Sequence, residues 1–284
     1  MNKISRRLIQ IITAIGINSY CIGFVQGNIY RGKLKNFCVP GLNCSSCPGA
    51  LGSCPLAMLQ TSIAGMVSLP IKIFTYGFLL LVGVTLGRFA CGWFCPFGLL
   101  QELIFKLPLP KLTLPEKIKP MENLKYVILV VFVILLPALS VYGISSTAFC
   151  RYLCPVEVLE ANLPLMIARP SLMQVIGLLF KWKLLLLIVV LVLSMIIFKP
   201  FCRFICPLGA IYSLFNPISL YRLEVEHDKC IQCGKCQKQC QIGIAVYKDP
   251  NSRECMRCNE CLNCPTQALG IKRYGKKATK TLEG

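Results

Sequence analysis

The sequence reads Cys91-Gly-Trp-Phe-Cys95-Pro-Phe-Gly98 at the end of one long apolar run, and Cys202-Arg-Phe-Ile-Cys206-Pro-Leu-Gly209 at the end of another. Two cysteines four positions apart on a helix share one face, with Cβ atoms about 5–6 Å apart. Two such pairs from neighbouring helices supply the four thiolates that an iron–sulfur cluster needs. A proline follows each pair and cannot continue a hydrogen-bonded helix, so we expect the chain to turn there. We predict one cluster on Cys91, Cys95, Cys202 and Cys206.

The C-terminal part carries a denser pattern, Cys230-x2-Cys233-x2-Cys236-x3-Cys240 followed by Cys255-x2-Cys258-x2-Cys261-x2-Cys264. Paired runs of this kind are typical of a two-cluster bacterial-type ferredoxin, in which the fourth cysteine of each run ligates the other cluster. The last gap of the second run is two residues, where three is usual. Zinc sites usually separate their cysteine pairs by a dozen or more residues, which favours iron–sulfur here. We therefore assign Cys230, Cys233, Cys236 and Cys264 to cluster 1, and Cys255, Cys258, Cys261 and Cys240 to cluster 2.

Six further cysteines compete for a fourth site: Cys38, Cys44, Cys47, Cys54, Cys150 and Cys154. The stretch Cys150-Arg-Tyr-Leu-Cys154-Pro is a third copy of the spaced motif. The chain also contains an internal repeat. Three stretches that begin with Cys-Pro resemble one another, namely Cys54–Gln60, Cys95–Gln101 and Cys154–Glu160. We predict an outer cluster on Cys54, Cys150, Cys154 and Cys47, with Cys44 as the alternative to Cys47. Whether this cluster is [4Fe-4S] or [2Fe-2S] stays open.

The composition is that of a membrane protein, because 55% of the residues are hydrophobic and only 15% are charged. A hydrocarbon core of about 30 Å needs a helix of about 20 apolar residues. Four stretches qualify: Leu8–Phe24, Ile71–Phe89, Leu124–Gly143 and Trp182–Phe198. The first is interrupted by Gly16, Asn18 and Ser19. The shorter apolar stretches Leu56–Leu69 and Val156–Ile167 are predicted to be re-entrant or interfacial.

We predict an α-helical membrane protein with four transmembrane helices in two parallel repeats, about 1–110 and 121–215, within a domain of residues 1–221. A C-terminal cytoplasmic two-cluster ferredoxin domain of the α+β class follows over 222–271, and 272–284 reads as a basic tail. Lys3, Arg6 and Arg7 favour a cytoplasmic N-terminus. Four spans then return the C-terminus to that side, so we expect a multi-pass protein of the cell membrane with both termini cytoplasmic.

The net charge of +19 has two readings. It reflects positively charged cytoplasmic loops, or it provides a surface for an acidic electron donor and for anionic membrane lipid. Nucleic acid is not an expected partner, because no nucleic-acid-binding module accompanies the charge. The single histidine, His227, excludes a haem held by two histidines. No glycine-rich dinucleotide fingerprint is present, so we do not expect NAD or FAD to bind through a Rossmann unit. We predict no catalytic residue.

The two motifs at Cys91 and Cys202, followed by the ferredoxin pair, resemble the NapH/NosR-type membrane-bound polyferredoxins, a 4Fe-4S-binding membrane protein family, over roughly residues 70–270. The resemblance implies a four-helix subunit that passes electrons between a cytoplasmic or quinol pool and proteins outside the membrane. The additional motifs look like those of small 4Fe-4S membrane proteins of anaerobes, which often accompany extracytoplasmic flavin-binding proteins. That implies an extracytoplasmic flavoprotein as the acceptor, with any flavin carried by the partner.

We therefore expect four [4Fe-4S] clusters to relay electrons from an acidic cytoplasmic donor, a ferredoxin or flavodoxin-like protein, to that acceptor. The chain would be an electron-transfer subunit of an oxidoreductase system rather than a stand-alone enzyme. One alternative is a quinol-oxidising membrane subunit. Another is a redox- or metal-sensing membrane regulator or assembly factor, which would tolerate loss of the outer cysteines.

Overall fold

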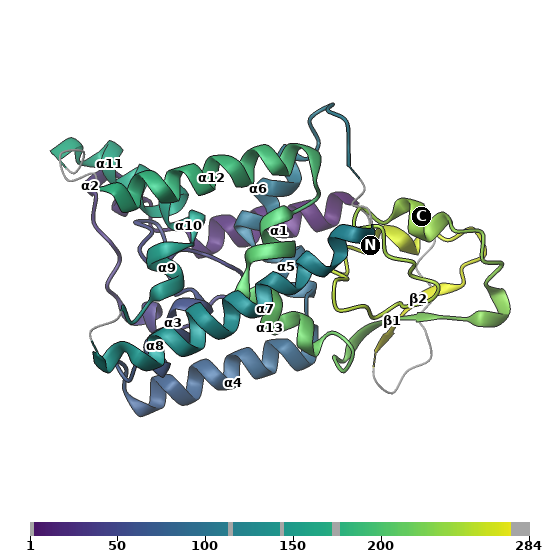
Figure 1. Ribbon diagram of the computed structural model, residues 1–284, viewed down its shortest axis with the longest axis horizontal. Coiled ribbons are helices and arrows are strands. Elements are labelled where there is room, and N and C mark those ends of the chain that lie inside the picture. Colours follow the sequence, from purple (N-terminus) through teal and green to yellow (C-terminus); the bar gives the residue numbers. More distant parts are fainter. Residues whose placement is uncertain (1–2, 113–115, 143–144, 172–176, 274–284) are drawn as a thin grey trace.

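The computed structural model describes residues 3–112, 116–142, 145–171 and 177–273. Long helical segments run side by side along the molecule, and a small domain that contains a two-stranded sheet lies at one end (Figure 1). Three segments are long and apolar enough to cross a membrane: Leu69–Leu86 (α4), Pro120–Ala138 and Leu178–Ile196 (α12). At 1.5 Å per residue each is roughly 27 Å long, close to the thickness of a hydrocarbon core. They correspond to the second, third and fourth predicted spans.

The segment Pro120–Ala138 contains α7 (Leu124–Ile128), a π-helical stretch (Leu129–Leu135) and α8 (Leu136–Ala138). The wider π turns precede Pro137, which offers no backbone N–H and crowds the carbonyl four residues earlier. The same arrangement recurs where α10 (Pro155–Glu157) continues through a π-helical stretch (Val158–Asn162) into α11 (Leu163–Ala168), which contains Pro164. Both helices therefore pass a proline without ending.

The first predicted span, Leu8–Phe24, is two helices in the structure and not one. The first helix, α1 (Lys3–Ile17), ends before Asn18, and α2 (Cys21–Gln26) follows the break. The Asn18 side chain donates to the carbonyl of Ala14 at 3.1 Å and to Oδ1 of Asn43 at 3.0 Å. Such side-chain bonds compete with the helical ladder. With 15 residues, α1 is shorter than the three helices of crossing length.

Large apolar side chains cover the outside of the long helices. Ile15 of α1 is 65% exposed and Leu80 of α4 is 59% exposed, whereas the polar Thr75 and Ser194 are buried. A water-soluble bundle shows the opposite pattern. This surface is therefore suited to lipid.

Four short helices each begin at the proline of a Cys-Pro step. They are α3 (Pro55–Ile63), α6 (Pro96–Ile104), α10 and α13 (Pro207–Phe215). In each, the cysteine is the N-cap and the proline is in the first turn, where its missing N–H leaves no hydrogen bond unmade. The prolines thus start the next helix, and at α6, α10 and α13 they also follow the end of a preceding helix. The other cysteine of each spaced motif lies in α5 (Phe89–Trp93), α9 (Ala148–Tyr152) or the π-helical stretch Phe201–Ile205.

The terminal domain is built on an antiparallel strand pair, β1 (Tyr221–Val225) with β2 (Leu269–Arg273), in which Tyr221 pairs with Arg273. Its helices are α14 (Lys235–Gln239) and two 3₁₀ turns, His227–Lys229 and Glu260–Leu262. The strands reach just beyond the predicted limits of 222–271, and residues 274–284 of the predicted tail lie outside the described residues. Further 3₁₀ turns occur at Lys33–Asn36, Glu116–Asn123 and Leu139–Tyr142.

The terminal domain packs against the end of the helical part where α1 begins (Figure 1). Arg6 of α1 reaches Glu260 of the domain, with Nη2 3.3 Å from Oε1. The Trp93 indole N–H donates to the carbonyl of Arg257 at 3.1 Å, and the buried Arg257 donates to the carbonyl of Leu86 at 3.1 Å. These contacts join the two parts through groups that are shielded from water.

Candidate iron–sulfur sites

The inner motifs meet in the structure. Cys91 lies in α5, Cys202 lies in the π-helical stretch, and Cys95 and Cys206 cap α6 and α13. All four are buried, and their thiols are close enough to interact electrostatically with one another. The backbone N–H groups of Gly98 and Gly209 donate to the capping sulfurs at 3.3 and 3.4 Å. Helix N-termini thus face this set of thiols, which favours negative charge there.

Cationic side chains surround the inner thiols. Arg88 is fully buried, donates to the carbonyl of Cys202 at 2.9 Å and pairs with Glu254 at 2.7 Å. Lys199 is buried and lies 3.3 Å from Glu102. Burial raises the pKa of the Cys91 thiol to about 11, although Arg88 acts against that rise. Cluster ligands must be thiolates. Arg88 and Lys199 favour the thiolate form of Cys91, and iron bound here would favour it further.

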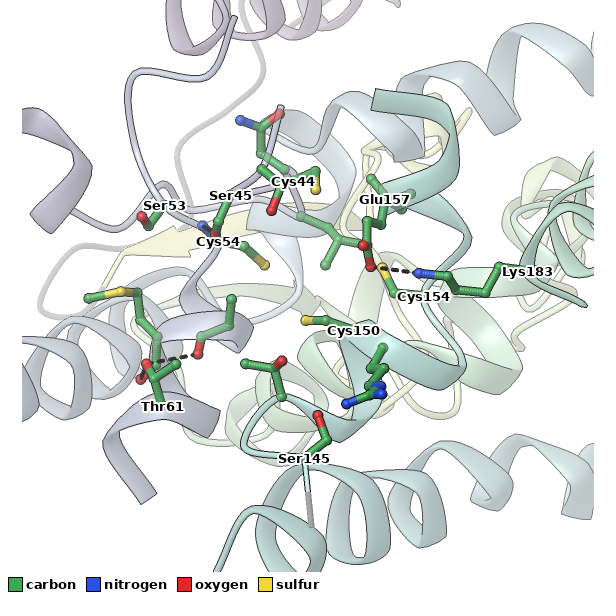
Figure 2. A pocket seen from close by; sticks show the side chains of 18 of the residues that line it. Cys44, Ser45, Ser53, Cys54, Thr61, Ser145, Cys150, Cys154, Glu157 and Lys183 are labelled. Carbon is green, nitrogen blue, oxygen red and sulfur yellow. Dashed lines mark hydrogen bonds and ion pairs between the residues drawn. The ribbon is translucent and has the colours of Figure 1, made fainter. Parts of the chain in front are cut away.

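The outer thiols surround a cavity of about 500 Å³, which is lined by Cys44, Cys54, Cys150 and Cys154 (Figure 2). The sequence-based choice for the fourth ligand was Cys47, but Cys47 does not line this cavity. Its sulfur lies 3.7 Å from Oδ1 of Asn18 instead. The alternative, Cys44, is held at the cavity because its backbone N–H donates to Oε2 of Glu160 at 2.6 Å.

A buried carboxyl accompanies the outer site. Burial raises the pKa of Glu160 to about 7, while the bond from Cys44 acts in the opposite direction. Glu157, one turn earlier, forms an ion pair with Lys183 at 2.9 Å (Figure 2). The pairing offsets the negative charge that Glu157 would otherwise add beside four thiolates.

The ferredoxin-type cysteines form two separate sets in the terminal domain. One cavity is lined by Cys230, Cys233, Cys236 and Cys264, and a second by Cys240, Cys255, Cys258 and Cys261. Each set combines three cysteines of one run with the fourth cysteine of the other run, despite the short gap before Cys264. Among the described residues, no three His, Cys, Asp or Glu side chains converge closely enough to hold a single metal ion. Four sulfur donors around a space fit the ligand demand of a [4Fe-4S] cluster.

The site predicted for cluster 2 and the inner site are in contact. The contact is made by the residue that follows one cysteine of each site. Gly92 follows Cys91, Met256 follows Cys255, and a Cβ on Gly92 would lie 2.5 Å from the Met256 carbonyl oxygen. Gln10 of α1 donates to the Gly92 carbonyl at 2.7 Å. The backbone segments that follow one ligand of each site are therefore in direct contact.

A loop that the sequence did not single out joins the inner and outer sites. A Cβ on Gly41 would lie 2.7 Å from Cα of Cys95, and the Cys95 thiol is 3.9 Å from the carbonyl oxygen of Leu42. Leu42 also lines the outer cavity. Cys44 follows two residues later, a reach of at most about 7 Å. In the sequence, the dipeptide Pro40-Gly41 is the local feature that indicates a close approach of this loop to another backbone segment, since glycine has no side chain.

Replacing Gly41 with alanine should destabilise the protein, because the new Cβ would meet backbone atoms of Phe94 and Cys95 that cannot move alone. Overpacking of this kind costs about 1–3 kcal/mol. Denaturant unfolding of the detergent-solubilised protein, with iron content, measures the effect. Gly77→Ala is the matched control, since a Cβ there meets nothing within 4 Å. Equal midpoints for the two variants would contradict the close approach.

A family model described as a 4Fe-4S binding domain matches residues 69–115, 126–159 and 179–222. These three segments contain all three Cys-x3-Cys-Pro motifs, at Cys91, Cys150 and Cys202. The match therefore includes all four inner cysteines and two of the four cysteines at the outer cavity, Cys150 and Cys154.

Curated relatives extend this match. An uncharacterized protein of Methanocaldococcus jannaschii, MJ0750, is 33% identical over 202 residues, which cover 68% of this chain and 75% of that protein. The putative electron transport protein YccM of Escherichia coli is 28% identical over 66% of this chain and 51% of its own length. The regulatory protein NosR of Pseudomonas aeruginosa is 30% identical over 61% of this chain and 22% of its own length. No solved structure matches. With its cysteine sites and apolar helices, the chain belongs to the NapH/NosR-type family of membrane-bound polyferredoxins, iron–sulfur proteins of electron transport that bind [4Fe-4S] clusters.

Proposed function

We propose that the protein carries electrons across the membrane, from a cytoplasmic donor to an extracytoplasmic acceptor, with a [4Fe-4S] cluster at each of its four cysteine sites. One observation carries the proposal. The four sets of cysteines are linked in series by contacts between neighbouring sets. The two terminal sets each include one cysteine from the other's run, Met256 meets Gly92, and Leu42 meets Cys95. When bound, the clusters supply one-electron carriers.

The ligands proposed for the terminal domain and the inner site are the twelve cysteines named from the sequence. For the outer site we propose Cys44, Cys54, Cys150 and Cys154, because these four line one cavity. The protein surroundings exclude water from the inner site, supply Arg88 and Lys199 as countercharges, and keep neighbouring sites within a few residues of each other.

We propose four spans, with α1 as the first, and both termini cytoplasmic. The apolar outer face of α1 supports its contact with lipid. The N-terminal end of α1 and the terminal domain lie at the same end of the molecule (Figure 1), as an even number of spans requires. The parallel repeat is supported by the equivalent order of long helix, spaced cysteines and Cys-Pro helix in α4–α5–α6 and in α12–π stretch–α13.

The donor is proposed to bind near cluster 1. Cys233 is exposed there, and Lys235 and Lys238 of α14 are close to it in the chain. Cationic side chains around an exposed site attract an acidic protein such as a ferredoxin or flavodoxin. The acceptor, proposed to be a flavoprotein, would meet the outer cavity, whose lining includes Arg151 and Ser145.

A quinol-oxidising subunit is the second candidate, and one cavity favours it. This cavity, of about 720 Å³, is lined mainly by apolar and aromatic side chains that include Tyr152, Leu178 and Trp182. It shares Arg151 and Leu179 with the outer cavity. A quinol in it would contact Arg151, which follows Cys150 in the chain, and would deliver electrons at the outer end.

Transfer across a sealed bilayer tests the proposal. Proteoliposomes containing the intact holoprotein are loaded with ferricyanide, and dithionite-reduced flavodoxin is added outside after excess dithionite is removed. We expect bleaching of the enclosed ferricyanide that depends on the protein. Bleaching no faster than in protein-free liposomes would contradict the proposal. Reduction by decylubiquinol, with no response to flavodoxin, would favour the quinol-oxidising alternative.

A further inference from the structure

We propose that Gln60 and Gln101 are positioning residues that raise the reduction potentials of the outer and inner clusters, each by donating a side-chain N–H to one ligand sulfur. The inference rests on the proposed cluster sites. The two glutamines occupy the same place in the repeat, six residues after Cys54 and Cys95. Both are fully buried.

Gln101 of α6 reaches across to the second half of the chain. Its Nε2 donates to the sulfur of Cys202 at 3.3 Å and to the carbonyl of Phe97, one turn back, at 3.3 Å. Its Oε1 accepts the backbone N–H of Phe201 at 3.2 Å. Both hydrogens and the oxygen of the amide are therefore engaged.

Gln60 of α3 makes the same three contacts at the outer site. Its Nε2 donates to the sulfur of Cys150 at 3.4 Å and to the carbonyl of Leu56 at 3.2 Å. Its Oε1 accepts the backbone N–H of Phe149 at 2.9 Å. Each glutamine thus binds the first cysteine of a spaced motif and the residue before it. Two independent sites with one geometry argue against an accidental contact.

The contacts also fix which end of the amide faces the sulfur. The backbone N–H of Phe149 or Phe201 can only donate, so the amide oxygen must face it. The NH₂ group then has to point at the helical carbonyl and at the cysteine sulfur. The donor at each sulfur is consequently determined by the protein backbone.

The corresponding positions in the second half of the chain do not supply such a donor. Glu160 follows Cys154 by six residues and accepts the N–H of Cys44. Tyr212 follows Cys206 by six residues and donates to the carbonyl of Pro40 at 3.2 Å. Among the described contacts, the amide at each site comes from the first half alone, and in the second half the equivalent side chain anchors the loop between the sites.

A hydrogen bond to a ligand sulfur affects the two oxidation states unequally. Reduction adds negative charge to the cluster and its thiolates, so the donated N–H stabilises the reduced state more and raises the potential. Removing the donor should therefore lower the potential of the cluster it serves. A tenfold fall in the ratio of reduced to oxidised cluster at fixed potential is about 59 mV for a one-electron couple, and we expect a shift of that order.

The test is a redox titration of the intact holoprotein followed by EPR, with iron and sulfide counted for each sample. Gln60→Met and Gln101→Met keep the length of the side chain and remove the donor. Gln60→Glu and Gln101→Glu keep the acceptor for the backbone N–H and remove the amide donor. Each variant should lower the midpoint of its own cluster and leave the other three unchanged. Ser62→Ala on α3 is the matched control, because it loses a buried bond to the Met58 carbonyl and no contact with sulfur.

Three outcomes would overturn the inference. The first is unshifted midpoints with full iron content, and the second is an equal shift of all four clusters. The third is loss of the cluster in both variants of a site, because the glutamine would then be needed to retain the cluster and not to set its potential. Failure of the proposed function is distinguishable, since it would appear in the unmodified protein, either as missing inner and outer signals or as no transfer in the proteoliposome assay.

Discussion

Replacing Cys154 with serine is expected to abolish electron transfer across the membrane while leaving the other three clusters intact. Cys154 is buried and lines the outer cavity, where a serine hydroxyl cannot replace the thiolate at neutral pH. Iron should fall from about 16 to about 12 atoms per chain. Flavodoxin-driven bleaching in proteoliposomes should fall to the level of protein-free liposomes, because a hydrocarbon core of about 30 Å is then left without its outer centre.

Two neighbouring variants make this prediction specific. Cys44→Ser should behave like Cys154→Ser, whereas Cys47→Ser should keep four clusters and full transfer, since Cys47 does not line the cavity. Cys21→Ser on α2 controls for loss of an exposed thiol. Wild-type transfer in Cys154→Ser would contradict the proposed series of clusters, because electrons would then cross without the outer centre.

Replacing Glu254 with glutamine should give the largest loss of stability among substitutions of residues that are not cluster ligands. Glu254 pairs with Arg88 at 2.7 Å and also with Lys125, and both cations are fully buried. Removing one partner of a buried ion pair costs about 3–5 kcal/mol. Burial raises the pKa of Glu254, but Arg88 and Lys125 outweigh it and hold that pKa below its ordinary value. The ionised carboxylate therefore stabilises the fold, and this contribution is lost as the pH falls through the lowered pKa.

Denaturant unfolding of the holoprotein in detergent measures the effect of Glu254→Gln. The matched control is Glu226→Gln, which breaks the pair between Glu226 and Lys229 on the surface of the same domain. Both side chains of that pair are exposed, so its loss should cost less than about 1 kcal/mol. Similar midpoints for the two variants would show that the contact between the domain and the helices does not depend on Glu254.

The sequence predicted those features that are encoded locally. Uninterrupted apolar runs identified the three helices of crossing length, because each helix satisfies its own backbone hydrogen bonds. The spacing of the ferredoxin cysteines predicted two sets of four, and the cysteines of each set line one cavity in the structure. Asn18 indicated where the first predicted span breaks, although its bond to Asn43 was not visible in the sequence.

What the sequence could not predict depends on contacts between distant residues. The sequence favoured Cys47 over Cys44, whereas Cys44 is held at the outer cavity by its bond to Glu160, 116 positions away. The repeat placed Gln60 and Gln101 in equivalent positions but could not reveal the sulfurs that they contact, 90 and 101 residues further along. The loop at Gly41 is likewise defined only by its contact with Cys95.

The most direct test of four cluster sites in series is the iron and acid-labile sulfide content of anaerobically purified protein, measured together with a redox-titrated EPR spectrum. Four [4Fe-4S] clusters require about 16 irons and 16 sulfides per chain, and we expect four separable signals. A value near 8, with only the two ferredoxin-type signals, would contradict the account, because the inner and outer cysteines would then hold no cluster.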